Sequence, residues 1–519
     1  MSAAASTPPR KLMRSIGRKT LLTLGSLLGI YLLLWLATCG GRGNVAVDYL
    51  QLMQELQPVG PEEERSWPLI REANKRVNEE RLALLRTAAG RRRIGFKIHP
   101  EMEEAELAIW PPPASAESGL LGQAVLQVRL PFLIGFGSAC QDLAADMTAA
   151  AARGDGQRAA ADAEAIIGLS RQLATPGSTL IQQLVGWSNL NLAATQVAQV
   201  LTAHPEAFTD GDLSRLAEAL RSLESSAFHF DLAVERFMIA DIVQRLYTDD
   251  GDGDGSLTLE GSIALRTGSV GEIGLSGSLP RWAAIAAAPL HSIVVASRRE
   301  LLERWNDYMD RLQSEADREP WVRDADTAFL LDIEVNRASE LERFRYELFF
   351  SLTPAFGPAM SAAARTEAMT GAARLVVAAE QFRRAMGRWP QSSAELTDLL
   401  GGDLPVDPWT GEPLRVGQVD ESLRVWSLCE DRTDEGGRPM LDPYGSQRPA
   451  VGPGYAGFFH EGAAAEGPAP EPELQQGWLL IPNWLGTSPL RGDWVLWPHS
   501  PPVTSPSPAN PAADPAPAP

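Results

Sequence analysis

A run of nineteen residues without a charged side chain lies near the start of the chain, at 20–38 (TLLTLGSLLGIYLLLWLAT). As a helix rising about 1.5 Å per residue it would be roughly 28 Å long, close to the thickness of the hydrocarbon core of a bilayer. Residues 1–42 carry six basic and no acidic side chains, and five of the six precede the run. Because basic residues favour the cytoplasmic side, we expect a cytoplasmic segment at 1–19, a single transmembrane helix at 20–38 and a periplasmic body.

The end of this run leaves one alternative open. Leu36-Ala37-Thr38-Cys39 is similar to the box of bacterial lipoproteins, in which the cysteine is lipidated after cleavage. That box normally has a smaller residue at the position of Thr38, and a cleaved signal has a shorter apolar region. We therefore favour a permanent anchor over a lipoprotein anchored at Cys39. Both leave the body tethered to a membrane.

The charge of the body limits its partners. After residue 42 the net charge is −26, from 40 basic and 66 acidic residues. A body this acidic would repel the phosphates of nucleic acids, and we therefore expect no nucleic-acid partner. The expected partners are the membrane and envelope proteins. Three cysteines, Cys39, Cys140 and Cys429, form no CxxC pair and predict no disulfide framework.

Helical periodicity dominates the first part of the body, which we expect to be a helical ectodomain at 39–248. Leu213, Leu216 and Leu220 follow the capping group Thr209 at spacings of three and four. Residues 138–174 are typical of two Ala-rich helices with a break at Gly154-Asp155-Gly156.

The middle of the chain changes character twice. Residues 249–280 are acidic and then rich in Gly and Ser, which indicates a flexible connector or lid. A second helical region is expected at 281–388. Trp282–Ala296 predicts a buried helix, interrupted by Pro289, in which His291 is a packed core residue. The expected apolar stripes of the two later helices are Leu301, Trp305, Tyr308, Met309 and Leu312, and Leu375, Ala379, Phe382 and Met386.

The last part of the chain is rich in Pro, Gly and Trp. Short apolar runs at 423–428, 478–481 and 494–497 predict strands bounded by turns. Residues 500–519 should be a disordered Pro-rich tail. The expected fold class is therefore mainly α, with an N-terminal transmembrane helix and a small α+β module at 389–499.

An ordered set of positions in this module resembles the globular end of bacterial type II secretion pseudopilins. In those proteins a helix leads into a Gly-x-Tyr-Pro turn, a short helix, a Pro-x-Asp-Pro-x-x-Gly-x-Pro-Leu segment and a strand pair that ends in an acidic loop. The matching positions are Gly387, Trp389, Pro390, Leu396, Leu399, Pro405, Asp407, Pro408, Gly411, Pro413, Leu414, Trp426, Ser427, Asp431, Gly436 and Gly437. The resemblance covers about 70 of the 519 residues and implies a pseudopilin-like fold.

The same resemblance implies a metal site. The acidic loop of major pseudopilins holds calcium, so the corresponding candidates are Asp431 and Asp434. The peptidase site that precedes the membrane segment of pseudopilins is absent, so the fold is carried over and the fibre-building role is not. As a whole, the layout from SWPLIREA near residue 70 to the final GDWVLWP looks like uncharacterised envelope proteins of planctomycete-type bacteria, which implies no activity.

A second acidic stretch, YTDDGDGDGSLTLE at 247–260, begins like an EF-hand calcium loop. Such a loop has oxygen ligands at positions 1, 3 and 5, Gly at 6, an aliphatic residue at 8 and a bidentate Glu at 12. The fitting residues are Asp250, Asp252, Asp254, Gly255 and Leu257, but position 12 is Gly261 and no exiting helix is expected. We therefore favour a solvated acidic turn over a calcium site.

No sequence pattern names a reaction. His99, His204, His229, His291, His460 and His499 lie far apart, and neither a phosphate loop nor GxSxG occurs. Acidic clusters at 62–64 and 101–104 are typical of solvated faces. The sequence favours a non-enzymatic, membrane-anchored scaffold or interaction protein. The alternatives are an envelope hydrolase with its site near residues 249–280 and a secretion-associated, pseudopilin-related component.

Overall fold

Helices dominate the part of the chain that the computed structural model describes. Described are residues 41–98, 124–128, 130–223, 228–267, 269–270, 273–274, 279–322, 335, 337–353, 356–419, 422–428, 433–434, 436–437 and 494–497, together with 23, 26, 29–33 and 35. The α-helices are α2 (Tyr49–Leu56), α3 (Trp67–Ala73), α4 (Asn78–Ala89), α6 (Phe132–Ala152), α7 (Gly156–Leu173), α8 (Leu180–Ala203), α9 (Asp210–Arg221), α10 (Ala233–Leu246), α11 (Leu259–Thr267), α12 (Arg281–Val294), α13 (Arg298–Ala316), α15 (Glu340–Arg345), α16 (Glu347–Leu352) and α17 (Phe356–Met386).

The remaining elements are short. The 3₁₀ turns are η1 (Glu62–Glu64), η2 (Val125–Gln127), η3 (Pro205–Ala207) and η5 (Ser393–Leu396). The strands are β1 (Ser269–Val270), β2 (Ile273–Gly274), β3 (Arg415–Val419), β4 (Ser422–Ser427) and β5 (Trp494–Trp497). The fold is thus mainly helical with a small three-stranded sheet, which confirms the coarse part of the predicted fold class.

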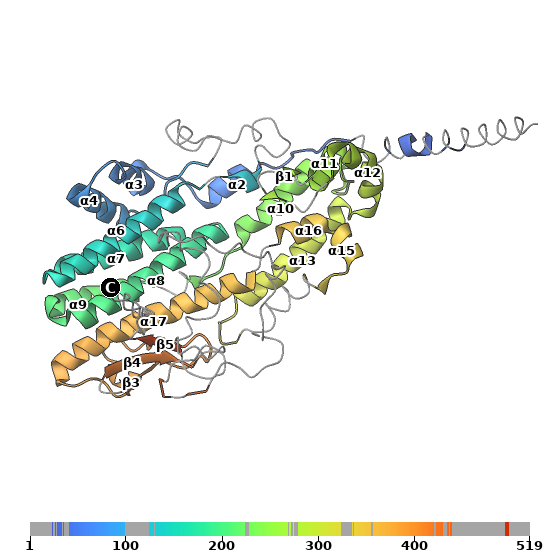
Figure 1. Ribbon diagram of the computed structural model, residues 1–519. Helices are drawn as coiled ribbons and strands as arrows, with labels where there is room; N and C mark the ends of the chain where they lie inside the picture. The colour runs from blue at the N-terminus through green and yellow to red at the C-terminus, as the bar shows by residue number, and fades with distance from the viewer. Residues whose placement is uncertain are drawn as a thin grey trace, which may run out of the picture.

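A stack of helices forms one half of the body, in which α6, α7, α8 and α17 pack side by side and α4 and α9 complete the layer (Figure 1). Small residues allow this close packing. A Cβ added to Gly168 would lie 2.6 Å from the carbonyl oxygen of Ala89, and one added to Gly156 would lie 2.3 Å from that of Ala207. The abundance of Ala and Gly in these helices therefore reflects the short distances between helix backbones.

The predicted break between two Ala-rich helices is confirmed. α6 ends at Ala152, Gly154 adopts a φ of +79°, and the Asp155 carboxylate accepts a hydrogen bond from Arg158 N (3.1 Å) at the start of α7. Gly is required at 154 because side chains disfavour this left-handed conformation. The predicted stripes of α9 and α13 are also buried, whereas Met386 in the last turn of α17 is 65% exposed, contrary to prediction.

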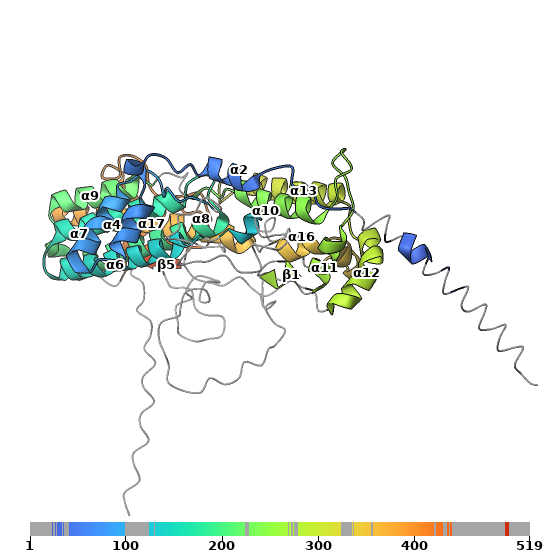
Figure 2. The same ribbon diagram turned by 90° about the horizontal axis from the view of Figure 1, so that it is seen from above.

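The other half of the body consists of α10 packed on α13, with α11, α12, α15 and α16 around them (Figures 1 and 2). Two segments here differ from the expectation. α11 and the β1–β2 hairpin occupy part of the expected connector at 249–280. Furthermore, the expected buried helix, α12, continues through Pro289 and exposes Trp282 to 75% and Leu290 to 63%.

The three-stranded sheet, with the order β3-β4-β5 and antiparallel pairing throughout, lies against α17 (Figure 1). Its β4 and β5 confirm the strands expected at 423–428 and 494–497. Residues 478–481 and the tail at 500–519 lie outside the described residues. The turn before β3 is organised by Asp407, which is 1% exposed and accepts hydrogen bonds from Trp409 N (3.0 Å), Ser427 Oγ (3.0 Å) and Leu428 N (2.8 Å).

Most of the apolar run at 20–38 lies outside the described residues, and so does Cys39, which follows it. Among those that are described, we find no helix with the length and apolar character to cross a membrane. From residue 41 the described chain runs along α10 toward α2 (Figure 1).

Candidate functional site

The acidic loop at 247–260 joins two helices and packs against a third. α10 ends at Leu246, α11 begins at Leu259, and Tyr247 and Leu257 pair across the loop as an isolated antiparallel bridge. The prediction that no helix follows this loop is therefore wrong. The arrangement is the helix, loop and helix order of an EF-hand.

The carboxylates of this loop are used within the protein. Asp250 Oδ1 accepts hydrogen bonds from the backbone N of Asp252 (2.9 Å) and Asp254 (3.0 Å). Asp254 Oδ1 accepts from Arg299 N (3.1 Å), in the first turn of α13, and Asp249 is paired with the Arg298 guanidinium. The backbone N of Gly251, with the Arg298 guanidinium, holds the pKa of Asp249 below its ordinary value, and the Ser297 hydroxyl, with the backbone N of Arg299, does the same for Asp254. The loop thus caps α13 in addition to facing solvent.

The missing ligand at position 12 has a packing cause. A Cβ added to Gly261 would lie 2.7 Å from the carbonyl oxygen of Leu246 and 2.9 Å from Leu257 Cδ1. The close approach of α11 to the end of α10 therefore requires glycine where an EF-hand has its bidentate Glu. Among the described residues no group of three or more His, Cys, Asp or Glu side chains is arranged to hold a metal ion.

The other predicted calcium position lies at the end of the sheet. Asp434 Oδ1 accepts hydrogen bonds from Trp426 Nε1 (3.2 Å) and Gly436 N (2.9 Å), and its Oδ2 lies 3.6 Å from Arg415 Nε. Its partner Asp431 lies outside the described residues. The described contacts of Asp434 are those of a side chain that fixes the turn after β4.

We expect calcium titrated into the full-length protein to bind the 247–260 loop with millimolar or weaker affinity. The reason is the missing bidentate carboxylate, together with the backbone amides that already use the Asp250 and Asp254 oxygens. Calorimetry checks this, with the Asp252→Ala variant as the control. Micromolar binding that Asp252→Ala abolishes would contradict it.

A polar cluster that the sequence did not reveal lies inside the protein, where α11, α12 and α16 meet. Ser262 Oγ is 2.8 Å from His291 Nδ1, and His291 Nε2 is 2.6 Å from Glu347 Oε1. The last two atoms are close but are not aligned as a hydrogen bond. The Arg266 guanidinium pairs with the same carboxylate and lies 4.7 Å from the centre of the Phe344 ring.

The cluster contains the hydroxyl, imidazole and carboxylate groups of an acyl-transfer triad, but the environment of these groups opposes that role. Ser262 is 0% and His291 2% exposed. Burial, aided by the positive charge of Arg266, lowers the pKa of His291 to about 3. So weak a base would take up a serine proton poorly at neutral pH. The cluster therefore acts as a buried polar contact between three helices, and His291 is the packed residue that the sequence predicted.

A second buried cluster joins α4, α6 and α7 through two carboxylates and two guanidiniums. Arg86 donates to Asp162 Oδ1 (2.7 Å) and Asp146 Oδ2 (2.6 Å), and Arg158 donates to both oxygens of Asp146. Asp162 is 0% exposed and its Oδ2 faces no donor. Burial, with the Asp146 carboxylate beside it, raises the pKa of Asp162 to about 7. A proton on Asp162 removes the cost of burying a second negative charge beside Asp146. In the sequence, this cluster is signalled by the carboxylate of Asp162 on the mostly apolar, buried stripe of α7.

We expect Asp162→Asn to stabilise the protein relative to wild type as the pH rises from about 4 to 7. Because the folded-state pKa of Asp162 lies above that of the unfolded chain, the folded state binds the extra proton, and stability falls with pH across this window. Asparagine removes that proton linkage and can donate to Asp146 permanently. Urea midpoints of both proteins at pH 4.5 and 7.5 check this. Equal differences at the two pH values would contradict it.

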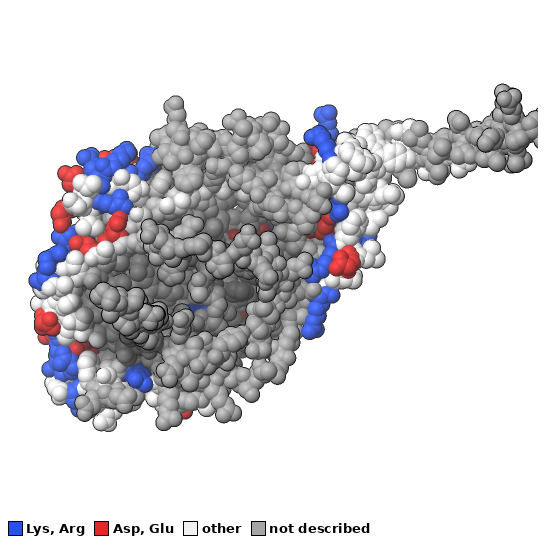
Figure 3. All heavy atoms as spheres, viewed as in Figure 1, with Lys and Arg blue, Asp and Glu red and all other residues white. Residues whose placement is uncertain are grey.

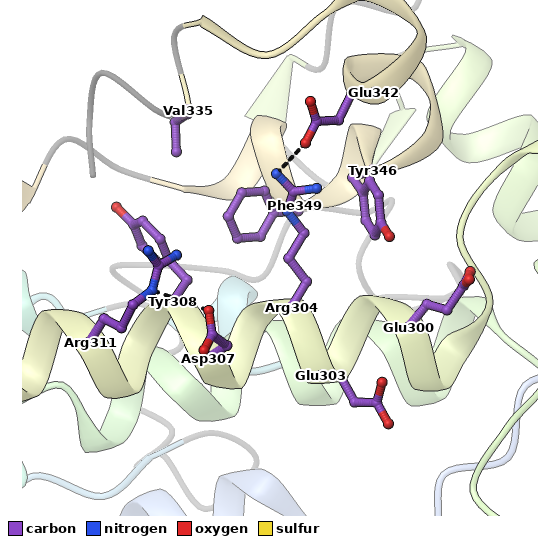
Figure 4. A pocket seen from close by; sticks show the side chains of 10 residues that line it. All are labelled: Glu300, Glu303, Arg304, Asp307, Tyr308, Arg311, Val335, Glu342, Tyr346 and Phe349. Atoms are coloured by element: carbon purple, nitrogen blue, oxygen red, sulfur yellow. Dashed lines mark ion pairs between the residues drawn. The ribbon is translucent and has the colours of Figure 1, made fainter. Parts of the chain in front are cut away.

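A groove with a volume of about 460 Å³ lies between α13 and the α15–α16 segment (Figure 4). Its lining residues are Glu300, Glu303, Arg304, Asp307, Tyr308, Arg311, Val335, Glu342, Tyr346 and Phe349. Arg304 projects into it, pairs with Glu342 (2.7 Å) and lies over the rings of Tyr346 (4.4 Å) and Phe349 (5.1 Å). The aromatic surface is thus covered by a cation of the chain itself, and the groove does not present a ready ligand site.

The remaining predicted positions have structural contacts or lie outside the described residues. Within the cluster at 62–64, Glu64 pairs with Arg93 (2.9 Å). The cluster at 101–104, His99, His460, His499 and Cys429 lie outside the described residues. Cys140 is a buried free thiol, and burial raises its pKa to about 12. His204 and His229 lie on separate elements, at the end of α8 and before α10.

In comparisons with known proteins, no family model, no curated protein and no solved structure matches this chain.

Proposed function

We propose that the chain is a non-enzymatic scaffold or interaction protein of the cell envelope, anchored in the membrane by residues 20–38 with its body on the extracytoplasmic side. The observation that carries this proposal is the way the chain after the apolar run is fixed to the body. An anchor joined by a loose tether would leave the body free to rotate, whereas a fixed junction suits a scaffold.

The junction consists of residues 41–48 laid along α10. Gln244 Oε1 accepts hydrogen bonds from Ala46 N and Val47 N (both 3.1 Å), and its Nε2 donates to Val47 O (2.8 Å). The same Nε2 donates to Asp241 Oδ1 (2.8 Å), and Asp241 is 1% exposed. A Cβ added to Gly43 would lie 2.1 Å from the carbonyl oxygen of Arg245, so glycine is required for this contact. The segment is therefore fixed to α10 by the buried side chain of Gln244, although most of its own residues are exposed.

The position of the sheet suits a surface that binds partners at a distance from the membrane anchor. β3, β4 and β5 lie along α17 in the half of the body away from α12 and from the departing N-terminal segment (Figures 1 and 2). We further propose that residues 389–499 form a pseudopilin-like module. The support is α17 leading into η5, the turn held by Asp407, and the β3–β4 hairpin. Such a module would face envelope or secretion partners.

The test begins with membranes that contain the full-length protein. We expect the protein to stay with the membrane after alkaline carbonate extraction and, once solubilised in detergent, to co-purify with envelope or secretion components. A matched deletion of residues 2–38 should release the body. If the protein behaved as soluble, or if it bound no envelope component and its body cleaved a wall fragment, the proposal would fail.

One observation favours an envelope hydrolase as the second candidate, namely the Ser262, His291 and Glu347 cluster next to the acidic loop. If this cluster were catalytic, Ser262→Ala would abolish wall-polymer cleavage without loss of fold. We expect instead no cleavage to lose and a modest loss of stability, because Ser262 is fully buried. Turnover of muropeptides by wild type and variant, with circular dichroism as the folding control, separates the two outcomes.

A further inference from the structure

α12 turns an apolar face to the outside of the molecule. Trp282 is 75%, Leu290 63%, Ile293 50% and Ile285 38% exposed. At 100° per residue these four side chains, with the exposed Ala286 between them, lie on one side of the helix. None of them is charged. A contiguous apolar face of this kind on a folded protein marks an interaction surface.

The buried side of α12 is the more polar one. His291 contacts Ser262 and Glu347, and the Ser292 hydroxyl donates to the carbonyl oxygen of Leu257 (2.8 Å). The other buried positions of the helix are Ala284, Ala288 and Pro289. A helix on a protein surface in water has the opposite arrangement, with its apolar stripe toward the core. The outer face of α12 is therefore suited to a surrounding less polar than water.

The apolar N-terminal segment lies beside this face. The Tyr31 hydroxyl donates to the carbonyl oxygens of Ile285 (3.4 Å) and Ala286 (3.2 Å), in the middle of α12. In the same segment Ile30 is 55% and Leu33 68% exposed. Uncharged surface gathers where α11 and α12 lie and the N-terminal segment departs, whereas charged side chains alternate around the opposite end of the body (Figure 3). The N-terminal segment and α12 thus meet at Tyr31, and both expose apolar side chains there.

We propose that α12 is a membrane-docking helix that lies in the headgroup region of the outer bilayer surface, with Trp282, Ile285, Leu290 and Ile293 directed into the lipid. This inference rests on the proposed membrane anchor and adds a second contact with the same bilayer. Trp is enriched at this depth, and an amphipathic helix buries its apolar face there. Arg281, exposed at the first position of α12, can extend to lipid phosphates. Two contacts fix the tilt of the body, which one anchor alone cannot do.

The test measures which tryptophans contact lipid. Full-length protein is reconstituted into vesicles of phosphatidylcholine and phosphatidylglycerol in which part of the lipid carries a nitroxide on its acyl chain. Tryptophan emission quenched by the nitroxide is compared among wild type, Trp35→Phe, Trp282→Phe and Trp389→Phe. Trp35 reports on the apolar run itself, and Trp389, next to the sheet module, is the matched control. We expect Trp35→Phe and Trp282→Phe each to remove roughly half of the quenched emission, and Trp389→Phe to remove none.

The outcomes separate this inference from the anchor on which it rests. If wild type shows no lipid quenching, the membrane anchor and the docking helix both fail. If Trp35→Phe removes the quenched emission and Trp282→Phe leaves it unchanged, the anchor stands and the docking helix is overturned, whether water or a second copy covers the face. If the run is removed from the mature protein, Trp282→Phe alone abolishes quenching, which supports docking without a transmembrane helix.

Discussion

Replacing Asp407 with alanine is expected to destabilise the sheet module while the helical stack keeps its stability. The substitution leaves three donors without their acceptor, namely Trp409 N, Ser427 Oγ and Leu428 N. A buried donor left unsatisfied costs about 1–3 kcal/mol, so the combined loss should be on the order of 3 kcal/mol or more. The contact to Leu428 links the turn at 405–414 to the end of β4, so the sheet loses its connection to the turn before it.

Hydrogen exchange of the solubilised protein measures this effect locally. Amides of β3 and β4 should exchange roughly 100-fold faster, in line with a loss of about 3 kcal/mol, while those of α6, α7 and α8 keep their protection. Glu412→Ala is the matched control, because Glu412 lies in the same turn but its side chain is 63% exposed and pairs with Arg415. Unchanged protection of β3 and β4 in Asp407→Ala would show that the buried carboxylate does not hold the module.

Replacing Arg86 with methionine should destabilise the helical stack by about 3–5 kcal/mol, the range seen when one member of a buried ion pair is removed. Methionine keeps most of the apolar stem but removes the guanidinium that donates to both Asp146 and Asp162. Asp162, with no exposed surface, then has no cation. The urea midpoint of the solubilised protein at pH 7.5 measures the loss.

Two variants control this experiment. Adding Asp162→Asn to Arg86→Met should restore much of the stability, because a neutral side chain at 162 needs no cation. Arg76→Met, which removes the surface ion pairs of a 49% exposed arginine with Glu72 and Glu80, should change stability by less than about 1 kcal/mol. Equal effects of Arg86→Met and Arg76→Met would contradict a special role for the buried cluster.

Local patterns in the sequence predicted elements well where the signal repeats within one element. Leu213, Leu216 and Leu220, and likewise Leu301, Trp305 and Leu312, are buried because a period near 3.6 places them on one face of a helix. The break at Gly154 follows from the left-handed backbone conformation that glycine allows. β4 and β5 follow from short apolar runs between turn residues.

Contacts between distant residues could not be predicted in this way. Ser262 and His291 are 29 residues apart and Gln244 and Val47 are 197 residues apart, and nothing in either local sequence names the partner. The acidic loop shows the same limit. Its sequence fits a calcium loop through eight positions, yet the approach of α11 to Leu246 decides that position 12 is glycine.

By itself, then, the sequence determined the helical character of the body, its division by Gly and Pro, the acidic charge and the apolar run at 20–38, because each depends on composition or on short-range periodicity. Only the tertiary structure decided which residues of distant segments meet and which face of α12 is buried. In α12 the periodicity is the same whichever face turns inward. The choice to bury His291 and expose Trp282 comes from Ser262, Glu347 and Arg266, which supply polar partners that an apolar core would lack.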